Sequence, residues 1–74
     1  MKLNNEFETI RKWANNKGIY KKGDIKTQYI KLQEECGELA KAIINKDDIE
    51  IIDAIGDCVV VLTSIAHFNN CKIE

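Results

Sequence analysis

The chain has 74 residues, with 11 Lys and Arg against 12 Asp and Glu and a formal net charge of −1. This length argues against a two-domain enzyme, and the balanced charge argues against a strongly basic nucleic-acid-binding module. A domain of this size buries only about 60% of the surface that its unfolded chain exposes. Three cysteines without metal-binding spacing suggest neither a disulfide framework nor structural zinc, so we expect self-association to supplement the core.

The first two expected helices are separated by glycines in a chain that contains no proline. Asn5 begins a capping-box pattern, and apolar residues then recur at helical spacing, which predicts a helix over residues 5–17 that ends at Gly18. Asp24 is the expected N-cap of a second helix over residues 25–45, where apolar spacings of four and three alternate.

The third expected helix covers residues 48–69 and begins with a capping box formed by Asp47 and Glu50. The preceding turn is so short that this helix forms an antiparallel hairpin with the second. Apolar residues surround it on nearly every side, which is more than two short helices can cover. A β-strand is the alternative, against which the helical spacing of its acidic residues argues. The expected fold is therefore all-α, an antiparallel helical hairpin plus an N-terminal helix, assembling into a bundle by oligomerisation.

Acidic residues form two stripes that the hairpin would bring together. They are Glu34, Glu35 and Glu38 on the second helix and Glu50, Asp53 and Asp57 on the third. Asp57 lies in the most apolar stretch and needs a positive partner from another helix, another subunit or a bound cation. Clustered carboxylates suit Mg²⁺ or Mn²⁺. The alternative for each residue is an exposed charge that pairs with a lysine, and Glu50 also has its capping role.

Two glycines interrupt the acidic segments, Gly37 in the second helix and Gly56 in the third. A helical glycine costs about 1 kcal/mol relative to alanine, which is tolerated where two backbones approach closely. We therefore expect tight packing beside the acidic stripes.

The start of the chain lacks the apolar stretch of a signal peptide, and its longest purely apolar run covers only residues 58–62. Basic residues are interleaved with acidic ones, which argues against direct nucleic-acid binding. We expect a reduced, cytoplasmic protein that binds neither membranes nor nucleic acid.

The segments QYIKLQEECGELA (28–40) and DAIGD (53–57) resemble the MazG-type all-α nucleoside triphosphate pyrophosphohydrolases. The family pattern is E-E-x-x-E, a spacer, and then E-x-x-D. The positions that match it are Glu34, Glu35, Glu38 and Asp57. Ala54 stands where the second half has a glutamate, and Asp53, one residue earlier, is expected to supply the missing carboxylate. The resemblance covers roughly residues 7–68.

The resemblance implies an Mg²⁺-dependent homodimer or homotetramer, with Mn²⁺ as a substitute, that splits nucleoside triphosphates, including non-standard or deoxy forms, into monophosphate and pyrophosphate. It implies three metal ligands, Glu35, Glu38 and Asp57, to which Asp53 is expected to add a fourth, and Glu34 would orient or deprotonate the attacking water. Lys31, and Lys17 or Arg11, would contact phosphates. Trp13 would stack on a base, although the sequence favours core packing for Trp13.

Two departures from the family keep a second function open. Ala54 removes one expected carboxylate, and family members usually continue into another helix with basic residues, whereas this sequence stops at Glu74. Residues 1–74 are then a single MazG-like domain without that helix. The sequence is a fragment, or a partner subunit replaces the missing helix, or the site is incomplete and the domain only binds its ligand. The alternative function is a non-catalytic helical dimerisation or nucleotide-binding regulatory module.

Overall fold

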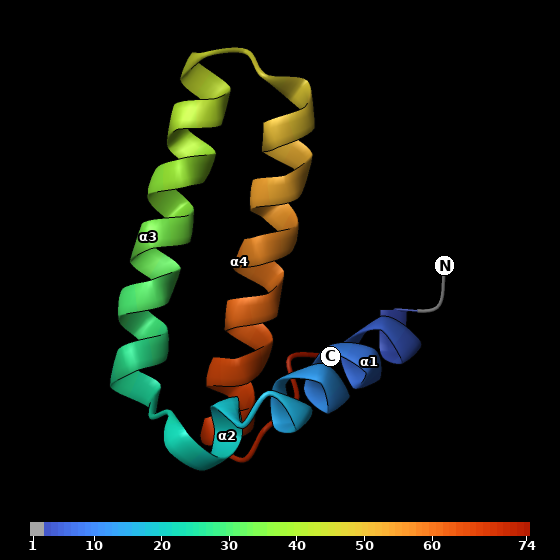
Figure 1. Cartoon of the computed structure of the whole chain (residues 1–74). Coiled ribbons are helices and arrows are strands. Elements are labelled where there is room, and N and C mark those ends of the chain that lie inside the picture. The colour runs from blue at the N-terminus through green and yellow to red at the C-terminus, as the bar shows by residue number, and fades with distance from the viewer. Residues whose placement is uncertain (1–2) are drawn as a thin grey trace.

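The computed structural model describes the backbone of residues 3–74 and the side chains from Glu6 onward. It contains helices α1 (Leu3–Asn16), α2 (Ile19–Lys22), α3 (Ile25–Ile44) and α4 (Asp48–Phe68). Helices α3 and α4 form an antiparallel hairpin, and α1 extends sideways from its base (Figure 1). The all-α prediction is confirmed. The strand alternative is wrong, because α4 continues without a break through the β-branched residues.

The first connection differs from the sequence-based expectation. Helix α1 begins two residues before the expected start, and the Asn5 side chain of the expected capping box lies outside the described side chains. Gly18 ends α1 as expected, in the left-handed conformation with a φ of 79°. Its carbonyl then accepts hydrogen bonds from the amides of Lys21 and Lys22, which builds the short helix α2 that the sequence analysis did not predict.

The N-caps of the hairpin helices are formed as predicted. The Asp24 carboxylate accepts a hydrogen bond of 2.7 Å from the Thr27 amide, and the Asp47 carboxylate accepts one of 3.2 Å from the Glu50 amide. The Asp47 amide donates to the Ala42 carbonyl instead of the Glu50 side chain. Only one half of the second capping box is therefore present, and the turn itself satisfies the other amide.

Gly23, at the junction of α2 and α3, approaches the backbone of α2 too closely for a side chain. Its amide donates to the Ile19 carbonyl at 2.8 Å, and a Cβ atom at this position would lie 2.6 Å from the same oxygen. We expect Gly23→Ala to destabilise the fold by about 1–3 kcal/mol, because the backbone must shift. Thermal unfolding followed by circular dichroism measures this loss, with the exposed neighbour Lys22→Ala as control. A melting temperature equal to that of the control would contradict the expectation.

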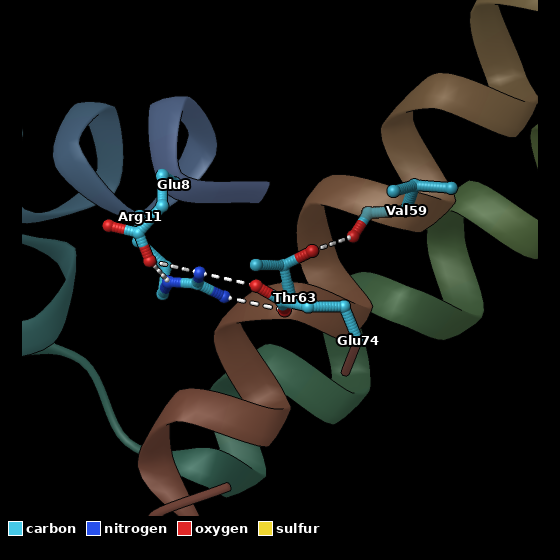
Figure 2. A network of polar contacts seen from close by, with 5 residues as sticks. All are labelled: Glu8, Arg11, Val59, Thr63 and Glu74. Carbon is cyan, nitrogen blue, oxygen red and sulfur yellow. Dashed lines mark hydrogen bonds and ion pairs between the residues drawn. The ribbon is translucent and has the colours of Figure 1, made fainter. Parts of the chain in front are cut away.

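The single chain has a small core. The buried apolar residues of the described part are Ala14, Ala42, Ala54 and Val61. The largest fully buried side chains are those of Thr63 and Ser64, whose hydroxyls donate to carbonyls one turn earlier; Figure 2 shows the bond from Thr63 to Val59. Large side chains at the turn end of the hairpin are exposed, among them Ile44 at 78% and Ile49 at 73%. Much of the apolar surface of α4 thus remains uncovered.

Gly37 and Gly56 do not mark close packing within this chain. A Cβ atom at either position would meet no atom of the chain within 4 Å outside the local helix backbone. The expected tight packing beside the acidic stripes is therefore wrong for the single chain, because both glycines lie on exposed helix surfaces.

Arg11 links α1 to the C-terminal segment. Its guanidinium donates to both carboxylate oxygens of Glu74, at 2.9 and 2.6 Å, and also to Glu8 (Figure 2). The Arg11 guanidinium lowers the pKa of the Glu74 carboxyl to about 2. Arg11 is thus held by two carboxylates, and the expected contact with phosphates is not available to it in this arrangement.

Helix α1 also contacts α4, and Ala14 on α1 is fully buried. Of the helices within residues 3–74, none combines the length and the apolar character that crossing a bilayer requires.

Candidate functional site

The hairpin places Glu35 and Asp57 at the same level on facing helices. Glu35 lies nine residues before Ile44, where α3 ends, and Asp57 lies nine residues after Asp48, where α4 begins. At a rise of about 1.5 Å per residue, both lie about 13 Å from the turn. Because α3 and α4 run side by side (Figure 1), their carboxylates can act on one ligand.

The Glu35 carboxylate lies near enough to Asp57 to affect its pKa. Partial burial raises the pKa of Asp57, and the nearby carboxylates of Glu35 and Asp53 raise it further, while Lys31 opposes the shift. The Lys31 ammonium lies 3.2 Å from a Glu35 oxygen and 3.7 Å from a Glu34 oxygen. The hydrogen bond to Glu35 is the main reason that the pKa of Lys31 is raised. The positive charge near Asp57 therefore comes from α3, which was one of the expected sources.

Glu38 lies one turn nearer the hairpin turn and faces a different neighbourhood. It is six residues before Ile44, opposite Ala54, which is six residues after Asp48 and only 4% exposed. An open cleft of about 210 Å³ borders Glu38; its other lining residues are Lys41, Ala42, Asn45, Asp47 and Glu50. The α4 carboxylate that shares this cleft with Glu38 is thus Glu50. The small Ala54 fills the position on α4 between the Glu35–Asp57 pair and the Glu38–Glu50 pair.

Within residues 3–74, no three His, Cys, Asp or Glu side chains converge on a point that could hold a metal ion. The donors nevertheless fit Mg²⁺, since proteins commonly hold this ion by one or two carboxylates and leave its other positions to water and substrate phosphates. Glu35 and Asp57 are such a pair. Asp53 is exposed one turn before Asp57, near enough for its carboxylate to raise the pKa of Asp57.

An apolar groove of about 350 Å³ borders Asp57 on the side away from α3. It lies between α1 and α4 and is lined by Thr9, Ile10, Trp13, Asp57 and Val60. Trp13 is 47% exposed, so its expected role in core packing is wrong for the single chain. Ile10 and Val60 were not predicted as site residues, although each lies three residues from a predicted one, Trp13 or Asp57, and hence on the same helix face.

The two lysines expected to contact phosphates lie on different segments of the chain. Lys31, on α3, is half-exposed and already bound to Glu34 and Glu35. Lys17 is exposed one turn beyond Trp13, with its amide bonded to the Trp13 carbonyl. An anion held at Asp57 through a cation would therefore meet positive charge from Lys31 on α3.

Comparisons with known proteins identify the family of this chain. The family model of the MazG nucleotide pyrophosphohydrolase domain matches residues 24–74, which include α3, α4 and the acidic pair but not α1. An uncharacterized 18.2 kDa protein from the rep-hol intergenic region of Haemophilus phage HP1 (strain HP1c1) is 38% identical over 65 residues. That match covers 86% of this chain but only 39% of the phage protein. No solved structure matches the chain.

Proposed function

The chain belongs to the MazG nucleotide pyrophosphohydrolase family, and we propose that it hydrolyses nucleoside triphosphates, with Mg²⁺, to monophosphate and pyrophosphate. The observation that carries this proposal is the proximity of Glu35 and Asp57, from facing helices, beside an apolar groove of about 350 Å³. A nucleotide has the same two parts, a polyanionic phosphate chain and an apolar ring face.

Each residue of the site then has a distinct task. Glu35 and Asp57 would hold Mg²⁺, with help from Asp53 and, one turn away, Glu38; the ion would supply charge neutralisation and a more acidic bound water. Glu34 is exposed next to Glu35, where it can orient the attacking water or accept its proton. Lys31, whose ammonium lies 3.2 Å from a Glu35 oxygen, would contact the substrate phosphates.

The direct test is pyrophosphate release from a panel of ribo- and deoxynucleoside triphosphates with Mg²⁺, at high protein concentration. We expect release that EDTA abolishes and that Mn²⁺ restores. Because the panel contains both sugars and several bases, the same experiment identifies the preferred substrate. The buried alanine at position 54 favours the alternative of a nucleotide-binding regulatory module. Saturable nucleotide binding without any pyrophosphate release would establish that alternative.

We also propose that the chain works as a homodimer or homotetramer. The exposed isoleucines at the turn end of the hairpin would cost several kcal/mol if they stayed in water, at about 25 cal/mol per Å² of apolar surface. We expect light scattering to show an oligomer at micromolar concentration, and thermal melts to shift upward as concentration rises. A monomer whose melt does not depend on concentration would contradict this prediction.

Trp13 is proposed to stack on the nucleobase in the apolar groove. Because it is the only tryptophan in the sequence, its fluorescence reports on this groove alone. We expect nucleoside monophosphates to quench it saturably in the absence of metal. Trp13→Ala should weaken monophosphate binding, measured by calorimetry, about 5-fold or more, since stacking on one aromatic contributes about 1–3 kcal/mol. Trp13→Phe keeps an aromatic ring and should lose much less. Equal affinities of the two variants would remove Trp13 from the binding site.

A further inference from the structure

Two of the three cysteines lie at nearly the same level of the hairpin. Cys36 is eight residues before Ile44 on α3, and Cys58 is ten residues after Asp48 on α4. At about 1.5 Å per residue, their Cα atoms lie about 12 and 15 Å from the turn. The antiparallel pairing of the helices thus brings together two thiols that are 22 residues apart in the sequence.

The surroundings of the two thiols allow them to meet. Both are free thiols; Cys36 is exposed and Cys58 is half-buried. Burial raises the pKa of Cys58, and the Cys36 side chain is near enough to contribute to this rise. Ala42 and Ala54, the buried residues on the turn side of the pair, are small, which lets the two helix backbones approach closely. Short Cα–Cα separations are what a disulfide requires.

We propose that Cys36 and Cys58 form a reversible disulfide that cross-links α3 to α4 within this chain, with hydrogen peroxide as the oxidant. The exposed Cys36 attacks peroxide as its thiolate, the O–O bond breaks, and Cys36 becomes a sulfenic acid while one water is released. The Cys58 sulfur then attacks the Cys36 sulfur and displaces the hydroxyl group, which leaves as a second water. Two thiols have lost two hydrogen atoms, and one peroxide has become two waters.

The disulfide would lie directly beside the candidate site, because Cys36 follows Glu35 and Cys58 follows Asp57. A covalent link here restricts how far the two carboxylates can separate to admit a cation and phosphates. We therefore expect the oxidised chain to bind Mn²⁺ more weakly than the reduced chain. This consequence rests on the proposed function, whereas formation of the bond does not.

The experiment uses the full chain with Cys71→Ser, so that Cys36 and Cys58 are the only thiols. After treatment with equimolar peroxide, intact mass under denaturing, non-reducing conditions should fall by two hydrogen atoms, and both thiols should disappear together from a thiol titration. Dithiothreitol should restore both. The matched control carries Cys36→Ser as well, and it should keep its remaining thiol. The oxidised chain should also melt at a higher temperature, since a closed loop restricts the unfolded chain.

Other products would overturn the proposal. A disulfide between two chains, a gain of oxygen atoms at either cysteine, or survival of the Cys58 thiol would each show that the pair does not bridge within the chain. Assays of disulfide formation and of pyrophosphate release, run in parallel, test the disulfide and the proposed function separately. If the bond forms but pyrophosphate is never released, only the proposed hydrolysis fails, whereas hydrolysis by a chain that never forms the bond rejects only the disulfide.

Discussion

Asp57→Asn is expected to lower kcat/KM for nucleoside triphosphates by more than about 100-fold while leaving the helices folded. Losing a partner of a metal ligand commonly costs about 10–100-fold, and Asp57 is proposed as a ligand itself. The substitution removes a charge without changing side-chain volume, so circular dichroism should show unchanged helix content. Mn²⁺ binding, measured by calorimetry, should weaken in parallel. The matched control is Asp48→Asn, the same change at the turn end of α4, which should leave hydrolysis intact.

The stability of the same variant tests the electrostatics of the site. Because the folded-state pKa of Asp57 is raised, the folded chain retains the proton longer than the unfolded chain as pH increases. Metal-free stability should therefore fall as pH rises from the ordinary aspartate value through the raised pKa. Asp57→Asn should lack this decline and be at least as stable as the parent at neutral pH. Urea unfolding at pH values below and above this range measures the decline in stability. An Asn variant that unfolds with or without Mg²⁺ would make Asp57 a structural residue.

The second large effect is expected at position 54. Ala54 is 4% exposed and lies opposite Glu38, so Ala54→Glu places a second carboxylate into the interface of α3 and α4. Without metal, an unpaired charge there should cost several kcal/mol. Mg²⁺ should recover much of that loss, because the ion would bind both carboxylates. Ala54→Gln has nearly the same size without the charge, and its stability should not respond to Mg²⁺. Melting temperatures with and without the ion distinguish the two.

The effect of Ala54→Glu on activity depends on whether Asp53 is a metal ligand. If Asp53 supplies the missing carboxylate, Asp53→Asn should reduce activity about as severely as Glu38→Gln, since ligands of one site act as a unit. Adding Ala54→Glu to Asp53→Asn should then restore part of the activity. The opposite pattern is a silent Asp53→Asn together with a large gain from Ala54→Glu alone. That pattern would show that the natural site lacks a ligand and would favour the regulatory module.

The parts of the fold that depend on local signals could be predicted from the sequence. Asp24 and Asp47 are N-caps because their side chains bond amides three residues later, which the local sequence alone determines. The equal distances of Glu35 and Asp57 from a short turn also follow from counting residues. Helix α2 could not be predicted, because it depends on the left-handed Gly18 presenting its carbonyl to two later amides.

The parts of the site that depend on how helices pack could not be read in this way. The groove beside Trp13 exists because α1 leaves the hairpin sideways, and no local pattern specifies that direction (Figure 1). Similarly, the sequence indicated that Asp57 needs a positive neighbour but left its source open. Lys31 on α3 acts on Asp57 while its ammonium is paired with Glu35, because α3 and α4 are in register, a non-local property of the hairpin.

The short connection from Asn45 to Asp47 also affects how quickly the protein forms. Helices and one tight hairpin supply most of the contacts in the described part of the chain, and most of these contacts are local in sequence. Chains with such low contact order fold in microseconds to milliseconds. If assembly is required for activity, the bimolecular encounter of preformed hairpins, rather than chain folding, should limit the appearance of active protein. Refolding jumps should then show a helical phase independent of concentration, followed by a concentration-dependent gain of activity.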